Sequence, residues 1–257
     1  KSAFVIDLAG RIGQGREVLG KYTRRVGVAY IAAEGANGVR KRIKAWRQEN
    51  PGATACALIS RPVNLLDQDQ VEDLVADLRA HGRDMLELHG VAIELICFDT
   101  LAACMPGASD SDTAQISLAI DRLQYIATAL SAFALTVTHT GKDEGRGIRG
   151  WSGQFAAADL VICISKAADE GAPSTGTIEK FKDGEGGLRF AFHLRQVTIG
   201  QNQRGKPITS IVPEFEDAPP RRQNALSRRL SPTQEKVLRA IRICTDAGQT
   251  VPASGDG

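Results

Sequence analysis

The chain has 257 residues, 42% of them hydrophobic, which favours one sizeable α/β core with a small appendage. No apolar segment reaches the roughly 18 residues of a membrane span and no signal peptide pattern is present, so we expect no membrane partner and a cytoplasmic location. The net charge of +2 gives no general argument for nucleic acid, and five scattered cysteines without a C-x-x-C pair exclude a disulfide framework or a zinc site.

Helices and strands are predicted to alternate along the first two thirds of the chain. In the first helix, residues 1–12, the apolar spacing places Phe4, Val5, Leu8 and Ile12 on one side. Alternating elements of this kind predict right-handed crossovers and a mostly parallel sheet flanked by helices, the α/β class. The other predicted helices cover residues 37–46, 67–81 and 113–130, and the predicted strands cover residues 26–33, 55–60, 91–100, 133–138 and 159–165.

The last third of the chain changes character. Residues 177–181, 188–198 and 208–212 alternate in the manner of antiparallel strands added at one edge of the sheet. Residues 213–230 are rich in Pro, Asp, Arg and Gln without periodicity, which predicts a linker. A helix is predicted to begin with Ser231 as its cap and Pro232 at its first position, and residues 231–257 could begin a winged-helix module.

Three predicted strands end in polar side chains. The apolar run of residues 91–100 ends in Asp99 and Thr100, the strand of residues 26–33 is followed by Glu34, and the strand of residues 133–138 is followed by His139. Ligands bind at the carboxyl edge of parallel sheets, so Asp99 is a candidate for organising a metal ion. The structural alternatives are a turn aspartate and a hydrogen-bonded structural histidine.

The first two residues complete a candidate nucleotide site. Lys1 and Ser2 open an amphipathic helix and fit the end of a G-x-x-x-x-G-K-[ST] phosphate loop, provided that the glycines lie just upstream. Asp99 and Thr100 fit a Walker B acid and its hydroxyl neighbour. Phosphoryl transfer needs a lysine at the phosphates, an acid and a hydroxyl at magnesium, and a polar group that orients water, so ATP and Mg²⁺ are the expected ligands.

Residues 1–212 resemble the RecA-like ATPase core of the plasmid and phage RepA type, which is related to the DnaB family of replicative helicases. The resemblance implies a RecA-like P-loop NTPase domain that assembles as a homo-hexameric ring with nucleotide sites between subunits. The segments that carry it are G-V-A-Y-I-A-A-E-G-A-N-G-V-R-K-R-I-K-A-W, L-I-C-F-D-T-L-A, A-L-T-V-T-H-T-G-K-D, R-G-I-R-G-W-S and E-K-F-K-D-G.

The resemblance also implies roles for individual residues. Lys1 would contact the β- and γ-phosphates, Ser2 would ligate magnesium, and Asp99 would hold magnesium through its water shell. Glu34 would polarise the attacking water, and His139 would be the polar sensor of the γ-phosphate.

The loop of residues 140–153 occupies the place where RecA-like proteins carry a DNA-contacting loop. It contains five glycines between residues 141 and 153, and Lys142, Arg146 and Arg149 could neutralise phosphates of single-stranded DNA. The alternative is a solvated flexible loop. Trp151 is the one aromatic residue in this loop, so contacts along the DNA backbone are expected rather than base readout.

Lys180 and Lys182 match the lysine pair that DnaB-like helicases insert into a neighbour's nucleotide site. The sequence departs from the RepA pattern because Ala158 and Asp159 stand where an arginine finger is expected, so this role falls to the two lysines or is absent. The alternative is a pair of solvated lysines at a hairpin.

The expected function is ATP hydrolysis coupled to translocation along, or unwinding of, single-stranded DNA in plasmid or phage replication. An alternative is a KaiC-like or RadA-like ATPase, regulatory or recombinational, that binds DNA without unwinding it. A weaker one is an ATP-independent interaction domain, which would require that the phosphate-loop glycines are missing.

Overall fold

Two four-stranded sheets, one parallel and one antiparallel, organise the chain. The computed structural model describes residues 1–108, 112–139, 152–167, 169, 171–184 and 186–216. These residues belong to one compact unit, Lys1–Ala218. The remaining unit, Pro219–Gly257, lies outside the described residues, and so does the helix predicted from Ser231.

The parallel sheet has the strand order β2-β1-β3-β4. Its two central strands are almost fully buried because helices cover both faces, which explains why they consist of nearly continuous apolar residues. The register places Ala32, Asp99 and Val137 side by side at the carboxyl ends of three neighbouring strands. The strands are β1 (Gly27–Ala32), β2 (Cys56–Ile59), β3 (Ile93–Asp99) and β4 (Phe133–Val137).

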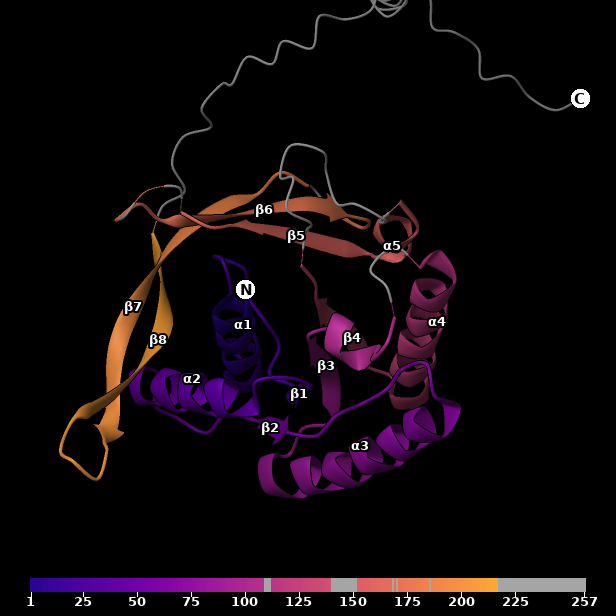
Figure 1. Cartoon of the computed structure of the whole chain (residues 1–257), viewed down its shortest axis with the longest axis horizontal. Helices are drawn as coiled ribbons and strands as arrows, with labels where there is room; N and C mark the ends of the chain where they lie inside the picture. The colour runs from indigo at the N-terminus through magenta and orange to yellow at the C-terminus, as the bar shows by residue number, and fades with distance from the viewer. Residues whose placement is uncertain (109–111, 140–151, 168, 170, 185, 217–257) are drawn as a thin grey trace, which may run out of the picture. The chain divides into compact units, whose positions relative to one another are not determined.

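Helices cover the two faces of this sheet, so the predicted α/β class is confirmed (Figure 1). Helices α1 (Ser2–Gln14) and α2 (Ala36–Glu49) share one apolar cluster with Val28 and Tyr30. Helices α3 (Gln68–His89) and α4 (Thr113–Leu130) share the opposite cluster with Phe98. A short 3-10 turn, η1 (Ala102–Cys104), follows β3, and helix α5 (Ser152–Ala157) precedes the second sheet.

The antiparallel strands form a sheet of their own, ordered β5-β6-β7-β8. This corrects the expectation that they extend one edge of the parallel sheet. The second sheet packs on α1 through aromatic rings, with Phe4 and Phe190 stacked at a centroid distance of 5.2 Å. The second sheet comprises β5 (Leu160–Ser165), β6 (Ser174–Phe181), β7 (Arg189–Gln201) and β8 (Pro207–Glu216).

The predicted linker begins too early in the sequence. Residues 213–216 belong to β8, where Pro213 pairs with Leu194 and Phe215 pairs with Phe192. The sequence of residues 213–216 shows no alternation of apolar residues, so no strand was predicted there. Phe215 nevertheless packs against Phe4 and Phe192, and this contact keeps the segment in β8. Strand β8 therefore extends past residue 212, where the linker was predicted to begin.

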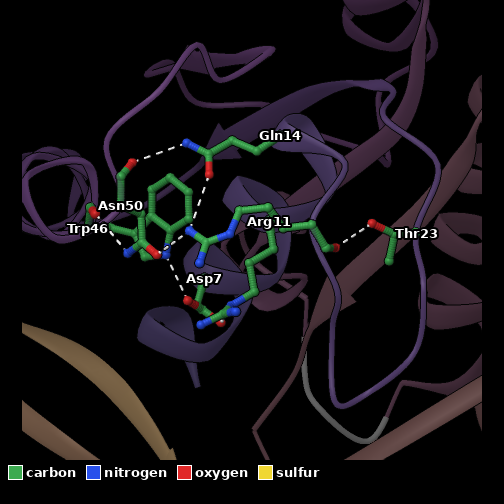
Figure 2. A network of polar contacts seen from close by, with 7 residues as sticks. Asp7, Arg11, Gln14, Thr23, Trp46 and Asn50 are labelled. Atoms are coloured by element: carbon green, nitrogen blue, oxygen red, sulfur yellow. Dashed lines mark hydrogen bonds and ion pairs between the residues drawn. The ribbon is translucent and has the colours of Figure 1, made fainter.

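A buried polar network joins α1 to α2 (Figure 2). The Trp46 indole donates to Asp7 Oδ1 at 2.7 Å, and Arg11 Nε donates to Asp7 Oδ2 at 2.7 Å. Further along α1, Gln14 donates to the Asn50 carbonyl oxygen at 3.1 Å. Asp7 is only 2% exposed, so its two donors replace the hydration that the carboxylate loses on folding.

Helix α1 is buried over a wider arc than its sequence pattern indicates. Phe4 and Val5 are buried as expected, whereas Leu8 and Ile12 are only partly buried. The helix is covered by the parallel sheet on one side and by β8 on another, so Ile6 and the polar Asp7 are also buried. Among the described residues, no helix combines the length and apolar character needed to cross a bilayer.

Candidate functional site

Three strand ends meet at the carboxyl edge of the parallel sheet. Ala32, Asp99 and Val137 lie side by side at the last paired position of three strands, and backbone hydrogen bonds continue just beyond them. Ala33 N donates to the Asp99 carbonyl oxygen at 3.0 Å, and Leu101 N donates to the Val137 carbonyl oxygen at 2.9 Å. The segments that follow these strands therefore leave the sheet next to one another.

Asp99 lies at the end of β3 and is 3% exposed. Its Oδ2 accepts a hydrogen bond of 2.6 Å from the hydroxyl of Tyr30, which lies on the neighbouring strand β1. Burial is the main cause that raises the pKa of Tyr30, and the negative charge of Asp99 adds to it, so the phenol stays protonated and donates. The structure thus gives this buried carboxylate a fixed orientation.

Glu34 and Thr100 are joined at the same edge. Thr100 Oγ1 donates to Glu34 Oε1 at 2.9 Å, and the Ala103 amide donates to Thr100 Oγ1 at 3.3 Å. Glu34 is followed by Gly35, whose φ of 58° is a left-handed conformation that glycine adopts without strain. This residue lets the chain turn from β1 into α2 and leaves the Glu34 carboxylate beside β3.

Lys1 reaches the same edge from the start of α1. Its Nζ donates to the Thr138 carbonyl oxygen at 2.7 Å, directly after β4. Partial burial of the ammonium lowers its pKa, and a nearby Cys163 acts in the opposite direction. Ser2 is the first residue of α1, so its hydroxyl stands at a helix N-terminus, where backbone N–H groups favour phosphate oxygens. His139 follows Thr138 and is exposed.

The residues at this edge suit magnesium rather than a transition metal. Carboxylate oxygens of Asp99 and Glu34 and hydroxyls of Ser2 and Thr100 are hard donors, which Mg²⁺ prefers. Within the described part of the chain, no three His, Cys, Asp or Glu side chains converge as a metal cage. Mg²⁺ is commonly held by one or two carboxylates together with substrate phosphates and water, and Asp99 and Glu34 are the carboxylates at this edge.

Comparison with protein families decides the broad identity. The AAA domain family model matches residues 1–145, more than half of the 257-residue chain. The chain belongs to the AAA domain family. The match covers Lys1, Glu34, Asp99 and His139, so all four residues of the edge described above lie within the AAA domain.

Other comparisons give no finer identity to this AAA domain. Among solved structures it is similar to the RadB recombinase, at 13% sequence identity and a TM-score of 0.49, over 76% of this chain and 83% of that chain. A similarity this low carries no argument about function. The search of the curated proteins found no match.

Lys180 lies on β6 and Lys182 lies just after it, beyond the residues that the AAA domain model matches. Lys180 Nζ donates to the carbonyl oxygens of Phe155 and Ala156, both at 2.9 Å, at the end of α5. Lys182 Nζ lies 3.2 Å from Asp159 Oδ1. Both lysines are thus held by residues 155–159 of their own chain. The predicted DNA-contacting residues Lys142, Arg146 and Arg149 lie outside the described residues.

Two site residues escaped the sequence analysis. Tyr30 was treated as part of an apolar strand, although a buried tyrosine hydroxyl requires a partner and therefore signals one. Arg42 on α2 carries a positive charge close enough to Tyr30 to oppose the rise of its pKa. The sequence places Arg42 only within the predicted helix of residues 37–46, because nothing in its spacing indicates that its charge acts on Tyr30.

Proposed function

We propose that this AAA domain is a RecA-like, ring-forming ATPase of the RepA type that couples ATP hydrolysis to movement along, or unwinding of, single-stranded DNA. The observation that supports the ATPase chemistry most directly is the meeting of Lys1, Glu34 and Asp99 at one sheet edge, each held by a named partner. The residue pattern shared with RepA and DnaB proteins supports the assignment to replication.

Each residue has a definite chemical task in this proposal. Lys1 neutralises the charge of the β- and γ-phosphates, and the first turn of α1 offers its backbone N–H groups to the same oxygens. Magnesium, when bound through Ser2 and Asp99, supplies charge neutralisation on the phosphates. Glu34 orients and polarises the attacking water, and its bond to Thr100 fixes the carboxylate on the side of Asp99.

Coupling to DNA is assigned to the residues after β4. His139 follows the carbonyl that Lys1 contacts, so it is placed to respond to the γ-phosphate. The segment that follows it carries Lys142, Arg146 and Arg149, whose charges suit the DNA backbone. A change in the position of His139 on hydrolysis is thereby passed to the DNA-contacting loop.

Coupling to assembly is assigned to Lys182, with Lys180 beside it. A cation that enters a neighbour's nucleotide site stabilises the charge of the transition state, so that hydrolysis requires a homo-hexameric ring. Lys182 is exposed on the protomer and is bound by a single ion pair to Asp159, which a neighbouring subunit can exchange. Lys180 has two carbonyl partners and serves instead to hold α5 beside β6.

The test compares ATP hydrolysis, with and without single-stranded DNA, and strand displacement on a forked duplex. DNA-stimulated hydrolysis with displacement supports the helicase, and the Glu34→Gln variant serves as the inactive control. Stimulated hydrolysis without displacement would point to the regulatory or recombinational ATPase instead. Full strand displacement by Glu34→Gln would overturn the proposal.

A further inference from the structure

Tyr30 is the residue of strand β1 whose side chain ends in a polar atom. It is 1% exposed and lies in the cluster between the sheet and helices α1 and α2, together with Val28 and Ala32. The register pairs Tyr30 with Cys97 and Ala32 with Asp99. The long phenol side chain therefore extends along the sheet by two residues, from the level of Cys97 to that of Asp99, and brings its hydroxyl to the Asp99 carboxylate.

The Tyr30 hydroxyl is a dedicated donor to Asp99. The bond is short, at 2.6 Å, and both residues are buried. Hydrogen bonds to a buried charged group are stronger than neutral ones, and leaving such a group without its donor is costly. Among the described residues, the phenol bonds to Oδ2 and no side chain bonds to Oδ1, so Oδ1 is the less engaged of the two carboxylate oxygens.

We infer that Tyr30 is a positioning residue for Asp99, which it holds in the orientation that binds the water shell of magnesium. The inference rests on the proposed function, in which Asp99 organises the Mg²⁺ of the ATP complex. It adds that a residue buried under α1 and α2, with no contact to nucleotide, sets the magnesium affinity of the site. A group that orients a metal ligand commonly changes metal affinity when it is removed.

The experiment replaces the phenol and measures magnesium directly. In the full-length protein, Tyr30→Phe removes the hydroxyl and keeps the ring. Binding of a fluorescent ATP analogue is followed as Mg²⁺ is added, and separately in EDTA. We expect the Mg²⁺ concentration at half-saturation to rise about tenfold, the lower end of the range for loss of a ligand's orienting partner. Affinity for the analogue in EDTA should stay unchanged, because Tyr30 acts through Asp99.

Val28→Ala is the matched control. Val28 is also on β1, on the same face and fully buried, so this change lowers stability without touching Asp99. Its Mg²⁺ dependence should equal that of the unaltered protein. A tenfold shift in Val28→Ala as well would overturn the inference, since general loosening of β1 would then explain the effect.

The Asp99→Asn variant separates the inference from the function on which it rests. If Asp99→Asn abolishes the Mg²⁺ dependence while Tyr30→Phe leaves it unchanged, Tyr30 is no positioning residue although the magnesium assignment stands. If Asp99→Asn itself has no effect, the magnesium assignment fails. Should Tyr30→Phe not fold, 3-fluorotyrosine at position 30 keeps the ring and hydroxyl but alters its acidity. A shifted Mg²⁺ dependence then supports the inference, and an unchanged one overturns it.

Discussion

The Thr100 hydroxyl donates to the Glu34 carboxylate across 2.9 Å, which joins the residue after β3 to the second residue after β1. Thr100 directly follows Asp99, so the acid assigned to magnesium and the acid assigned to water are connected through one side chain. The two carboxylates thus keep a fixed relation even though they come from segments 65 residues apart in the sequence (34 and 99).

Removing either carboxylate should stop or slow hydrolysis, but the two changes should differ in their effect on nucleotide binding. Glu34→Gln keeps the size and a hydrogen-bonding oxygen but cannot polarise water, so the hydrolysis rate should fall by about 10²–10⁴-fold while nucleotide binding largely survives. Asp99→Asn should abolish hydrolysis and weaken Mg²⁺-dependent binding. Steady-state hydrolysis and fluorescent nucleotide binding measure the two effects.

Glu49, at the C-terminal end of α2, provides a control for the Glu34→Gln and Asp99→Asn variants. Glu49 pairs with Arg195 of β7, away from the strand ends. Glu49→Gln should therefore hydrolyse ATP at the unaltered rate. Full hydrolysis by either Glu34→Gln or Asp99→Asn would reject the assigned mechanism.

Lys182→Ala should lower assembly-dependent hydrolysis by about 100-fold, the typical loss for a donor that acts on transition-state charge, with nucleotide binding intact. The rate is measured as a function of protein concentration. Asp159→Asn distinguishes the trans role from the ion pair, because it releases Lys182 without removing it. If Asp159→Asn lowers hydrolysis as much as Lys182→Ala does, the ion pair within the chain explains the loss, and the role of Lys182 in a neighbouring site is rejected.

Two helix glycines should respond oppositely to the same substitution. A Cβ on Gly10 of α1 would lie 2.4 Å from the Trp46 ring, which is 2% exposed and hydrogen-bonded to Asp7. Gly10→Ala should therefore destabilise the protein by about 1–3 kcal/mol. A Cβ on Gly82 of α3 meets nothing within 4 Å, so Gly82→Ala should stabilise it by about 0.5–1 kcal/mol.

Thermal and denaturant unfolding of the two alanine variants measure these changes. Both glycines lie inside helices, so helix propensity alone favours alanine at each. Equal effects of the same sign at both positions would show that the contact of Gly10 with Trp46 does not govern the packing of α1 on α2.

Asp7 should give the protein a pH-dependent stability. Burial is the main cause that raises the pKa of Asp7 above 3.8, against the opposing influence of Arg11 and Trp46. Between the unfolded and the raised folded pKa, the folded state binds more protons than the unfolded state. The free energy of unfolding therefore falls as pH rises through this window and levels off above it.

Asp7→Asn removes this contribution and keeps an oxygen for the Trp46 indole. The stability of the unaltered protein relative to Asp7→Asn should therefore decrease from pH 4 to pH 7, as measured by denaturant unfolding at each pH. Asp121→Asn, an exposed change on α4, should show no such trend. A stability of the unaltered protein relative to Asp7→Asn that instead increases from pH 4 to pH 7 would contradict the assigned cause.

Much of the carboxyl edge of the parallel sheet could be predicted from the sequence because central parallel strands are short apolar runs. The polar residue that follows such a run marks the carboxyl edge, and Glu34 and Asp99 were brought together on that basis. The four strands of the parallel sheet were all predicted, with boundaries within two residues of those observed. The apolar runs and the polar residues after them are local features of the sequence, which can be recognised without knowing the tertiary contacts.

The remaining features depend on contacts that local pattern does not show. The bond from Tyr30 to Asp99 requires the register of β1 on β3, and a slip by one residue would turn Tyr30 to the other face. Helix α3 was predicted to stop before Gly82, but it continues to His89 because Met85 packs against Gly27. The separate antiparallel sheet likewise reflects packing on Phe4, which no periodicity reveals.

The polar network between Asp7, Trp46 and Asn50 has a mechanical consequence. Helix α1 begins at Lys1 and Ser2, and α2 begins just after Glu34, so the network joins two helices that begin beside residues of the proposed nucleotide site. The hydrogen bonds of the network resist relative movement of α1 and α2, so the two helices form one stiff unit. In the proposed ATPase cycle we therefore expect movement at the strand end at Thr138, where Lys1 Nζ contacts the Thr138 carbonyl oxygen.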